Sequence, residues 1–149
     1  MPTKTITRDI EETTPFREFE HTGDVGIEVY APTRCELFRR AVVALGSLLV
    51  EPASVSAIEQ REISIAADAD ADLIHDLLSE LLGLFTAEGF TWREASVKEV
   101  DRSLEVTLRG ERFNPKRNEF RGEIKAVTYH QLTVEESAKG WRARIILDV

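Results

Sequence analysis

The sequence predicts an α+β fold: a two-layer sandwich in which two helices pack on one face of a mixed, mainly antiparallel β-sheet. Two stretches carry apolar residues at helical spacing, and short alternating segments lie before and between them. Four further strands with tight turns close the chain. Strands and helices in this order are typical of a sheet with its helices gathered on one face. In a chain of 149 residues we expect a flexible tail over 1–14 and one domain over 15–149.

The first half of the domain supplies two strands and a helix. Alternation over 16–19 favours a short strand, and alternating apolar residues predict another strand over 25–31. Thr33 followed by Glu36 is a capping-box pattern. Apolar residues then recur every three or four positions, which predicts a helix with one apolar face over 34–49.

Three alternating acids come before the second helix. A predicted strand near 60–67 leads into Asp68, Asp70 and Asp72. Their spacing is similar to the start of a calcium loop, but the glycine and distal glutamate of such a loop do not follow. We therefore predict that these carboxylates cap the next helix and favour its positive end. Gly89 is expected to end that helix.

The last third of the chain is predicted to be all strand. Two tight turns, one at 101–103 and one at 138–140, mark hairpins. The expected strands run near 91–100, 104–112, 124–135 and 141–148.

Composition excludes several classes of protein. With 19 basic and 27 acidic residues the net charge is −8, which argues against broad, sequence-independent nucleic-acid binding. It leaves open docking to a basic partner and binding of a cation. The apolar stretches are too short for a membrane span, and the N-terminus has no apolar signal region. One cysteine, Cys35, suits a reducing compartment, so we expect a cytoplasmic protein.

Standard catalytic signatures are missing from the sequence. There is no phosphate-binding glycine loop, no nucleophile elbow and no zinc-protease motif. Three histidines and one cysteine make a structural zinc site a poor fit. His75 falls on the polar side of the second predicted helix, where we expect it to be solvated.

The remaining candidates are carboxylates near the ends of two predicted strands. Asp148 precedes Val149, so its side chain lies beside the last main-chain carboxylate, an arrangement that a cation would offset. Asp24 lies between Gly23 and Gly26, where the backbone can bend and a ligand can approach. The alternative is a turn aspartate that satisfies local N–H groups.

Two further residues could support such a site. Lys125 begins an apolar-rich strand, where it could neutralise a carboxylate, contact a partner or simply extend into solvent. His21 could hold Asp24 in place or be an ordinary turn residue.

Four segments together resemble the archease family over about residues 16–149. They are Glu20-His-Thr-Gly-Asp24-Val-Gly-Ile27, Glu36-Leu-Phe38, Glu123-Ile-Lys-Ala-Val-Thr-Tyr-His130 and the terminal Ile146-Leu-Asp-Val149. The resemblance implies a non-catalytic accessory protein of the RtcB-type tRNA-splicing ligase. Such a protein promotes guanylylation and multiple turnover of the ligase. The family is also linked to chaperone-like assistance of a tRNA methyltransferase.

The resemblance also implies a site for a hard divalent cation. The family's metal ligands match Asp24, Asp148 and Val149, and its motif lysine matches Lys125. We expect Ca²⁺ first, with Mg²⁺ or Mn²⁺ as alternatives. Glu20 stands where family members often have Asp, which keeps an acid but lengthens it.

Two other functions stay open at this point. A chaperone or adaptor of RNA-processing enzymes would need no metal and would bind through an apolar patch. A stand-alone metal-dependent hydrolase is weakly supported, because no motif places a general base.

Overall fold

The computed structural model describes residues 4–6, 16–21 and 24–149. The expected tail lies mostly outside these residues; within it, Lys4–Ile6 (β1) pairs with β2. The remaining strands are β2 Phe16–His21, β3 Asp24–Ala31, β4 Glu59–Ala66, β5 Phe90–Val100, β6 Ser103–Arg112, β7 Ala126–Val127, β8 Thr133–Ser137 and β9 Gly140–Asp148. The helices are α1 Arg34–Leu49, the 3-10 turn η1 Pro52–Ser54 and α2 Asp70–Glu88.

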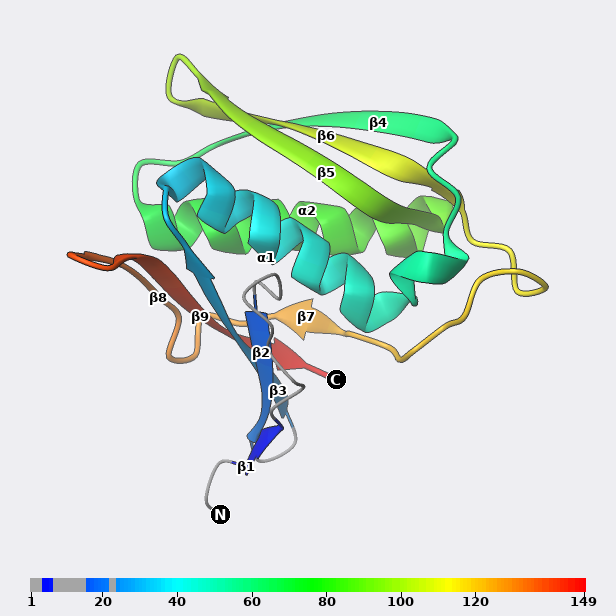
Figure 1. The fold of residues 1–149 in the computed structure, drawn as a ribbon, viewed down its shortest axis with the longest axis horizontal. Coiled ribbons are helices and arrows are strands. Elements are labelled where there is room, and N and C mark those ends of the chain that lie inside the picture. The colour runs from blue at the N-terminus through cyan, green and yellow to red at the C-terminus, as the bar shows by residue number, and fades with distance from the viewer. Residues whose placement is uncertain (1–3, 7–15, 22–23) are drawn as a thin grey trace.

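The strands form two sheets, and the helices lie between them (Figure 1). One sheet has the order β1-β2-β3-β9-β7, with β8 also paired to β9; the other has the order β4-β6-β5. Every strand pairing among the described residues is antiparallel. The predicted α+β class is confirmed.

The layering differs from the expected single sheet covered on one face. Helix α1 contacts β3 of one sheet and β5 of the other. Its buried residues include the consecutive run Ala44–Ser47, so α1 is covered on more than one side. A helix buried this widely needs a partner layer on each side, which two sheets provide.

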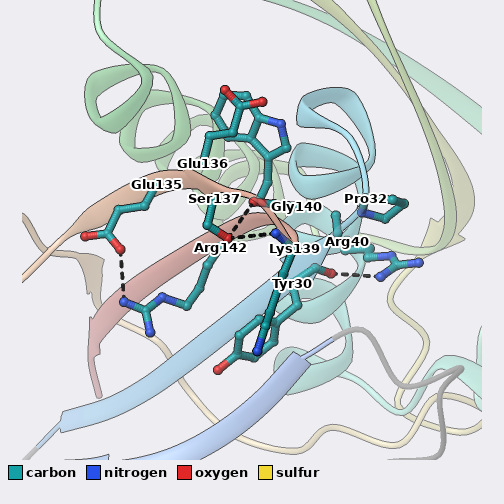
Figure 2. A pocket seen from close by; sticks show the side chains of 11 residues that line it. Tyr30, Pro32, Arg40, Glu135, Glu136, Ser137, Lys139, Gly140 and Arg142 are labelled. Carbon is teal, nitrogen blue, oxygen red and sulfur yellow. Dashed lines mark hydrogen bonds and ion pairs between the residues drawn. The ribbon is translucent and has the colours of Figure 1, made fainter.

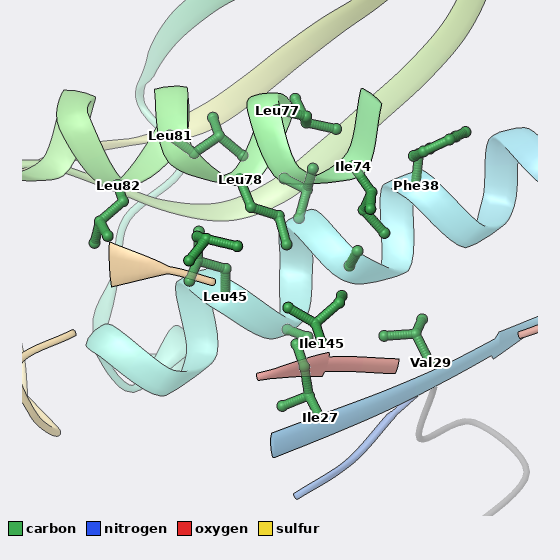
Figure 3. Close-up of a cluster of buried hydrophobic side chains, with 14 of the residues drawn as sticks. Ile27, Val29, Phe38, Leu45, Ile74, Leu77, Leu78, Leu81, Leu82 and Ile145 are labelled. Atoms are coloured by element: carbon green, nitrogen blue, oxygen red, sulfur yellow. The ribbon is translucent and has the colours of Figure 1, made fainter. Parts of the chain in front are cut away.

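The core fills the space between helices and sheets (Figure 3). Ile27 and Ile145, paired across β3 and β9, point toward Leu45 and Leu78 of the helices. All four side chains are fully buried. Burial of such side chains stabilises a fold by about 1.5–3 kcal/mol each. The β3–β9 ladder is therefore held in place by the core behind it.

The helix ends show which capping predictions hold. Thr33 accepts a hydrogen bond from the Glu36 N–H (3.2 Å), as expected for an N-cap. Gly89 ends α2 in the left-handed conformation, with φ 68°. The cap predicted for α2 is wrong: Ala69 occupies the N-cap position and makes no side-chain cap. Asp70 and Asp72 instead lie in the first turn, where their charge still suits the helix dipole.

The predicted strand over 124–135 is also wrong. Only 126–127 and 133–137 are strands, and the chain turns between them, with Gln131 at φ 51°. Both strands pair with β9, at different points along it. The alternating side chains hid this turn, which contains no glycine or proline.

Candidate functional site

Two aspartates face each other at one end of the β3–β9 ladder. Asp24 opens β3, Asp148 closes β9, and the two residues are directly paired across the antiparallel ladder. Opposed residues in such a ladder point to the same face, with Cβ atoms roughly 4.5–5.5 Å apart. Both residues are partly buried. The fold therefore brings together two candidates that are 124 positions apart in the sequence.

Strand β7 lies on the other side of Asp148. Ala126 is paired with Asp148, and the N–H of Lys125 donates to the Asp148 carbonyl (2.7 Å). The side chain of Lys125 is exposed. Asp148 thus connects two other predicted site residues: it is paired with Asp24 and is bonded to the backbone of Lys125.

This arrangement concentrates negative charge. Like charges directly opposite each other in a ladder destabilise the pair unless a cation offsets them. Oxygen donors of this kind suit hard cations such as Ca²⁺. In the part of the chain that the structure describes, no three Asp, Glu, His or Cys side chains converge as a metal site. The pair would therefore need main-chain oxygens, such as those of the exposed Val149, or water.

The predicted role of His21 falls on a side chain outside the described residues. Its backbone is paired with Asp24 at the end of the β2–β3 ladder. Its predicted support of Asp24 therefore stays a prediction.

A hollow of about 290 Å³ adjoins Val149. Strands β2 and β3, helix α1 and the segment 121–124 line it. Arg121 at its edge forms an ion pair with Glu51 and donates to the Ser47 carbonyl (3.0 Å). The approach to Val149 is thus bordered by an arginine that already has partners.

His75 was predicted to be solvated, and this prediction is wrong. Its ring stacks on Tyr129, with centroids 3.8 Å apart, and its Nε2 lies 3.1 Å from the Val127 carbonyl oxygen. The Tyr129 hydroxyl donates to Asp72 (3.0 Å). Partial burial of the phenol and its bond to Asp72 raise the pKa of Tyr129 above 10.0. Helical spacing assigned His75 to the polar face of α2 but carried no sign of the segment that covers it.

A larger hollow, of about 620 Å³, lies at the opposite end of the same ladder (Figure 2). Several of its charged groups already have partners. Arg142 donates to Glu135 (3.0 Å), and Arg40 donates to the Tyr30 carbonyl (2.8 Å). None of the described residues lining this hollow is a predicted site residue.

Comparison with known proteins matches this fold and sequence to one family. The model of the Archease protein family (MTH1598/TM1083) matches residues 16–149. The chain belongs to the archease family. Protein archease of Methanosarcina acetivorans is 32% identical over 139 residues, covering 90% of this chain and 95% of that protein. Protein archease of Pyrococcus abyssi is 31% identical over 139 residues, covering 90% of this chain and 98% of that protein.

Solved archease-family structures share the fold. The solution structure of Methanobacterium thermoautotrophicum protein 1598 matches with a TM-score of 0.76 at 29% identity, covering 92% of this chain and 100% of that one. The crystal structure of a Thermotoga maritima archease, described as a possible chaperone, matches with a TM-score of 0.66. At 24% identity, over 87% of this chain and 94% of that one, it supports the fold alone.

Among the described residues of this archease, no helix combines the length and apolar character needed to cross a bilayer. The cytoplasmic location expected from the sequence stays a prediction.

Proposed function

We propose that this protein is a non-catalytic activator of an RtcB-type RNA ligase and acts through a hard-cation site at Asp24 and Asp148. The observation that carries the proposal is the direct pairing of these two aspartates across β3 and β9. Membership of the archease family supports the identity of the partner. Val149, which follows Asp148, is the proposed source of further oxygen ligands.

The chain's own residues would hold the cation and meet the partner. The two carboxylates supply negative oxygen donors, and the sheet fixes their relative position. The backbone of Lys125 is bonded to Asp148, and its exposed side chain is available to a phosphate or acid of the ligase. When bound, the cation supplies positive charge and open coordination positions. Binding of this protein to the ligase would favour the ligase conformation that is ready for guanylylation. The effect would be a shift in the populations of ligase conformations.

The test is RNA ligation by the RtcB-type ligase of the same organism, with RNA in excess. Wild-type protein is expected to give rapid multiple turnover. Asp24→Ala and Asp148→Asn should abolish this stimulation and keep the fold, because each removes one of two negative ligands. Asp68→Asn is the matched control, since it removes an exposed carboxylate elsewhere.

Normal stimulation by both site variants would overturn the site assignment. No stimulation by the wild type, with an active ligase, would overturn the proposed partner.

An adaptor role for enzymes such as a tRNA methyltransferase is the second candidate. Its support is one exposed aromatic side chain: Phe120 is 50% exposed and lies near the partly buried Phe85 and Phe113, with centroid distances of 6.4 and 6.1 Å. Half-exposed aromatic side chains often anchor protein partners. Such binding should survive a chelator and weaken in Phe120→Ala, whereas cation-dependent binding should be lost with the chelator.

A further inference from the structure

One segment connects the candidate cation site to helix α2. The residues 124–132, here called the strap, run along β9 and contain the two-residue strand β7. So short a strand has little stability of its own. Its position must therefore depend on contacts beyond the ladder.

Ile124 and Val127 of the strap are buried in the core, and helix α2 adds a polar contact through His75. The Val127 carbonyl can only accept a hydrogen bond, so the His75 Nε2–H donates to it across 3.1 Å. The other ring nitrogen lies 3.1 Å from the Asp76 carboxylate on the same helix. The ring is thus fixed between its own helix and the backbone of the strap.

Tyr129 makes a second connection. Its ring stacks on His75 at an interplanar angle of 16°, and its hydroxyl donates to Asp72 at the start of α2. Although 55% exposed, the side chain is held at both its face and its polar end. An aromatic stack and a hydrogen bond to a charged acceptor together stabilise a contact more than either does alone.

The opposite edge of the strap is bonded to the end of β9, which carries Asp148 of the candidate site. The N–H of Lys125 donates to the Asp148 carbonyl (2.7 Å), and the N–H of Thr128 donates to the Ile146 carbonyl (3.1 Å). His75 is hydrogen-bonded to Val127, which lies between Lys125 and Thr128 along the chain. Fixing Val127 therefore fixes the register of the strap against the end of β9.

We propose that His75 and Tyr129 are positioning residues that hold the strap against β9, and thereby keep the Lys125 backbone bonded to Asp148 of the candidate pair. The functional part of this inference rests on the proposed function. The structural part stands on the contacts of α2 with the strap.

Amide hydrogen exchange on the free protein tests the structural part. Tyr129→Ala should accelerate exchange of the Lys125 and Thr128 amides by roughly tenfold, because it removes both the stack and the Asp72 bond. Tyr129→Phe keeps the stack and should stay near wild type. His75→Ala is the second variant and should also accelerate exchange. Phe120→Ala, which truncates a half-exposed aromatic outside the strap, is the control.

Calorimetric titration of the same variants with Ca²⁺ tests the functional part. Tyr129→Ala and His75→Ala should bind the cation roughly tenfold more weakly, because the Lys125 N–H would no longer hold the Asp148 backbone in place. Tyr129→Phe should keep most of the affinity. Unchanged exchange at Lys125 in both variants would overturn the positioning role. If the wild type binds no Ca²⁺, the proposed cation site fails, while the exchange data still decide whether α2 holds the strap.

Discussion

At the scale of single residues, the main feature is a pair of acids that oppose each other at the end of one ladder. Asp24 and Asp148 oppose each other on one face of the sheet. Two like charges in this position cost stability unless something binds them. Residues that serve a site often carry such a cost, because the ligand is what offsets it.

This predicts a gain in stability from loss of the site. In the presence of a chelator, Asp148→Asn should raise the free energy of unfolding by about 0.2–1 kcal/mol, since it removes the repulsion. With Ca²⁺ added, only the wild type should be stabilised, because only it binds the ion. Urea unfolding under both conditions measures this difference. A variant less stable than wild type in chelator would show that Asp148 has a structural role instead.

The sequence could name the two aspartates but not their pairing. Gly23 and Gly26 marked Asp24, and the position beside Val149 marked Asp148. Their meeting depends on the antiparallel alignment of β3 with β9, which is a long-range property. His75 was missed for the same reason, since its partners Val127 and Tyr129 come from a segment more than 50 positions away.

At the scale of elements, local signals predicted the helices well. Periodicity and the Thr33 cap gave α1 its observed bounds, and Gly89 marked the end of α2. The strap was not predictable, because alternation alone cannot separate one strand from two strands on the same neighbour. Contacts with α2 decide where the chain leaves β9.

Helix packing gives an element-scale prediction with a built-in control. A Cβ on Gly46 of α1 would lie 2.5 Å from the Trp92 Nε1, which donates to the Val42 carbonyl (2.9 Å). Gly46→Ala should therefore destabilise the protein by about 1–3 kcal/mol through overpacking. Gly83 of α2 has open space around it, so Gly83→Ala should stabilise by about 0.5–1 kcal/mol.

Thermal unfolding of both variants measures the two effects. If both variants changed the stability by equally small amounts, the prediction would be contradicted, because α1 could then move away from β5 without loss of stability.

At the scale of the whole molecule, a buried polar group joins two distant parts of the chain. Glu111, 2% exposed, accepts from the Ser56 N–H (2.7 Å) and the Asn118 amide (3.1 Å) and pairs with Arg117. Burial alone would raise the pKa of Glu111. The hydrogen bonds and the arginine outweigh burial and lower its pKa below 4.5.

The sign of this shift predicts an acid dependence of stability. A carboxyl with a lowered pKa in the folded state contributes fully above about pH 4.5, and its contribution is lost as pH falls through the folded pKa. Glu111→Gln should lower the free energy of unfolding at pH 7. It should also reduce the loss of stability that the wild type shows as the pH falls below 4.5. Glu62→Gln, an exposed control on β4, should keep the wild-type profile. Urea unfolding across this pH range measures the effect. The prediction is contradicted if both variants keep the wild-type dependence of stability on pH.

The partition of strands into two sheets with helices between them also belongs to this scale. The sequence predicted most strands, but pairings such as Ile27 with Ile145 join segments more than 100 positions apart. The same ladder brings the two aspartates together, so the candidate site depends on the long-range pairing of β3 with β9.

Calorimetric titration of Ca²⁺ into the free protein tests the central claim most directly. The wild type and Asp68→Asn are expected to bind one cation per chain, whereas Asp24→Asn and Asp148→Asn should show no binding. Retention of wild-type affinity by both site variants would contradict the account, because the paired carboxylates would then not be the cation site.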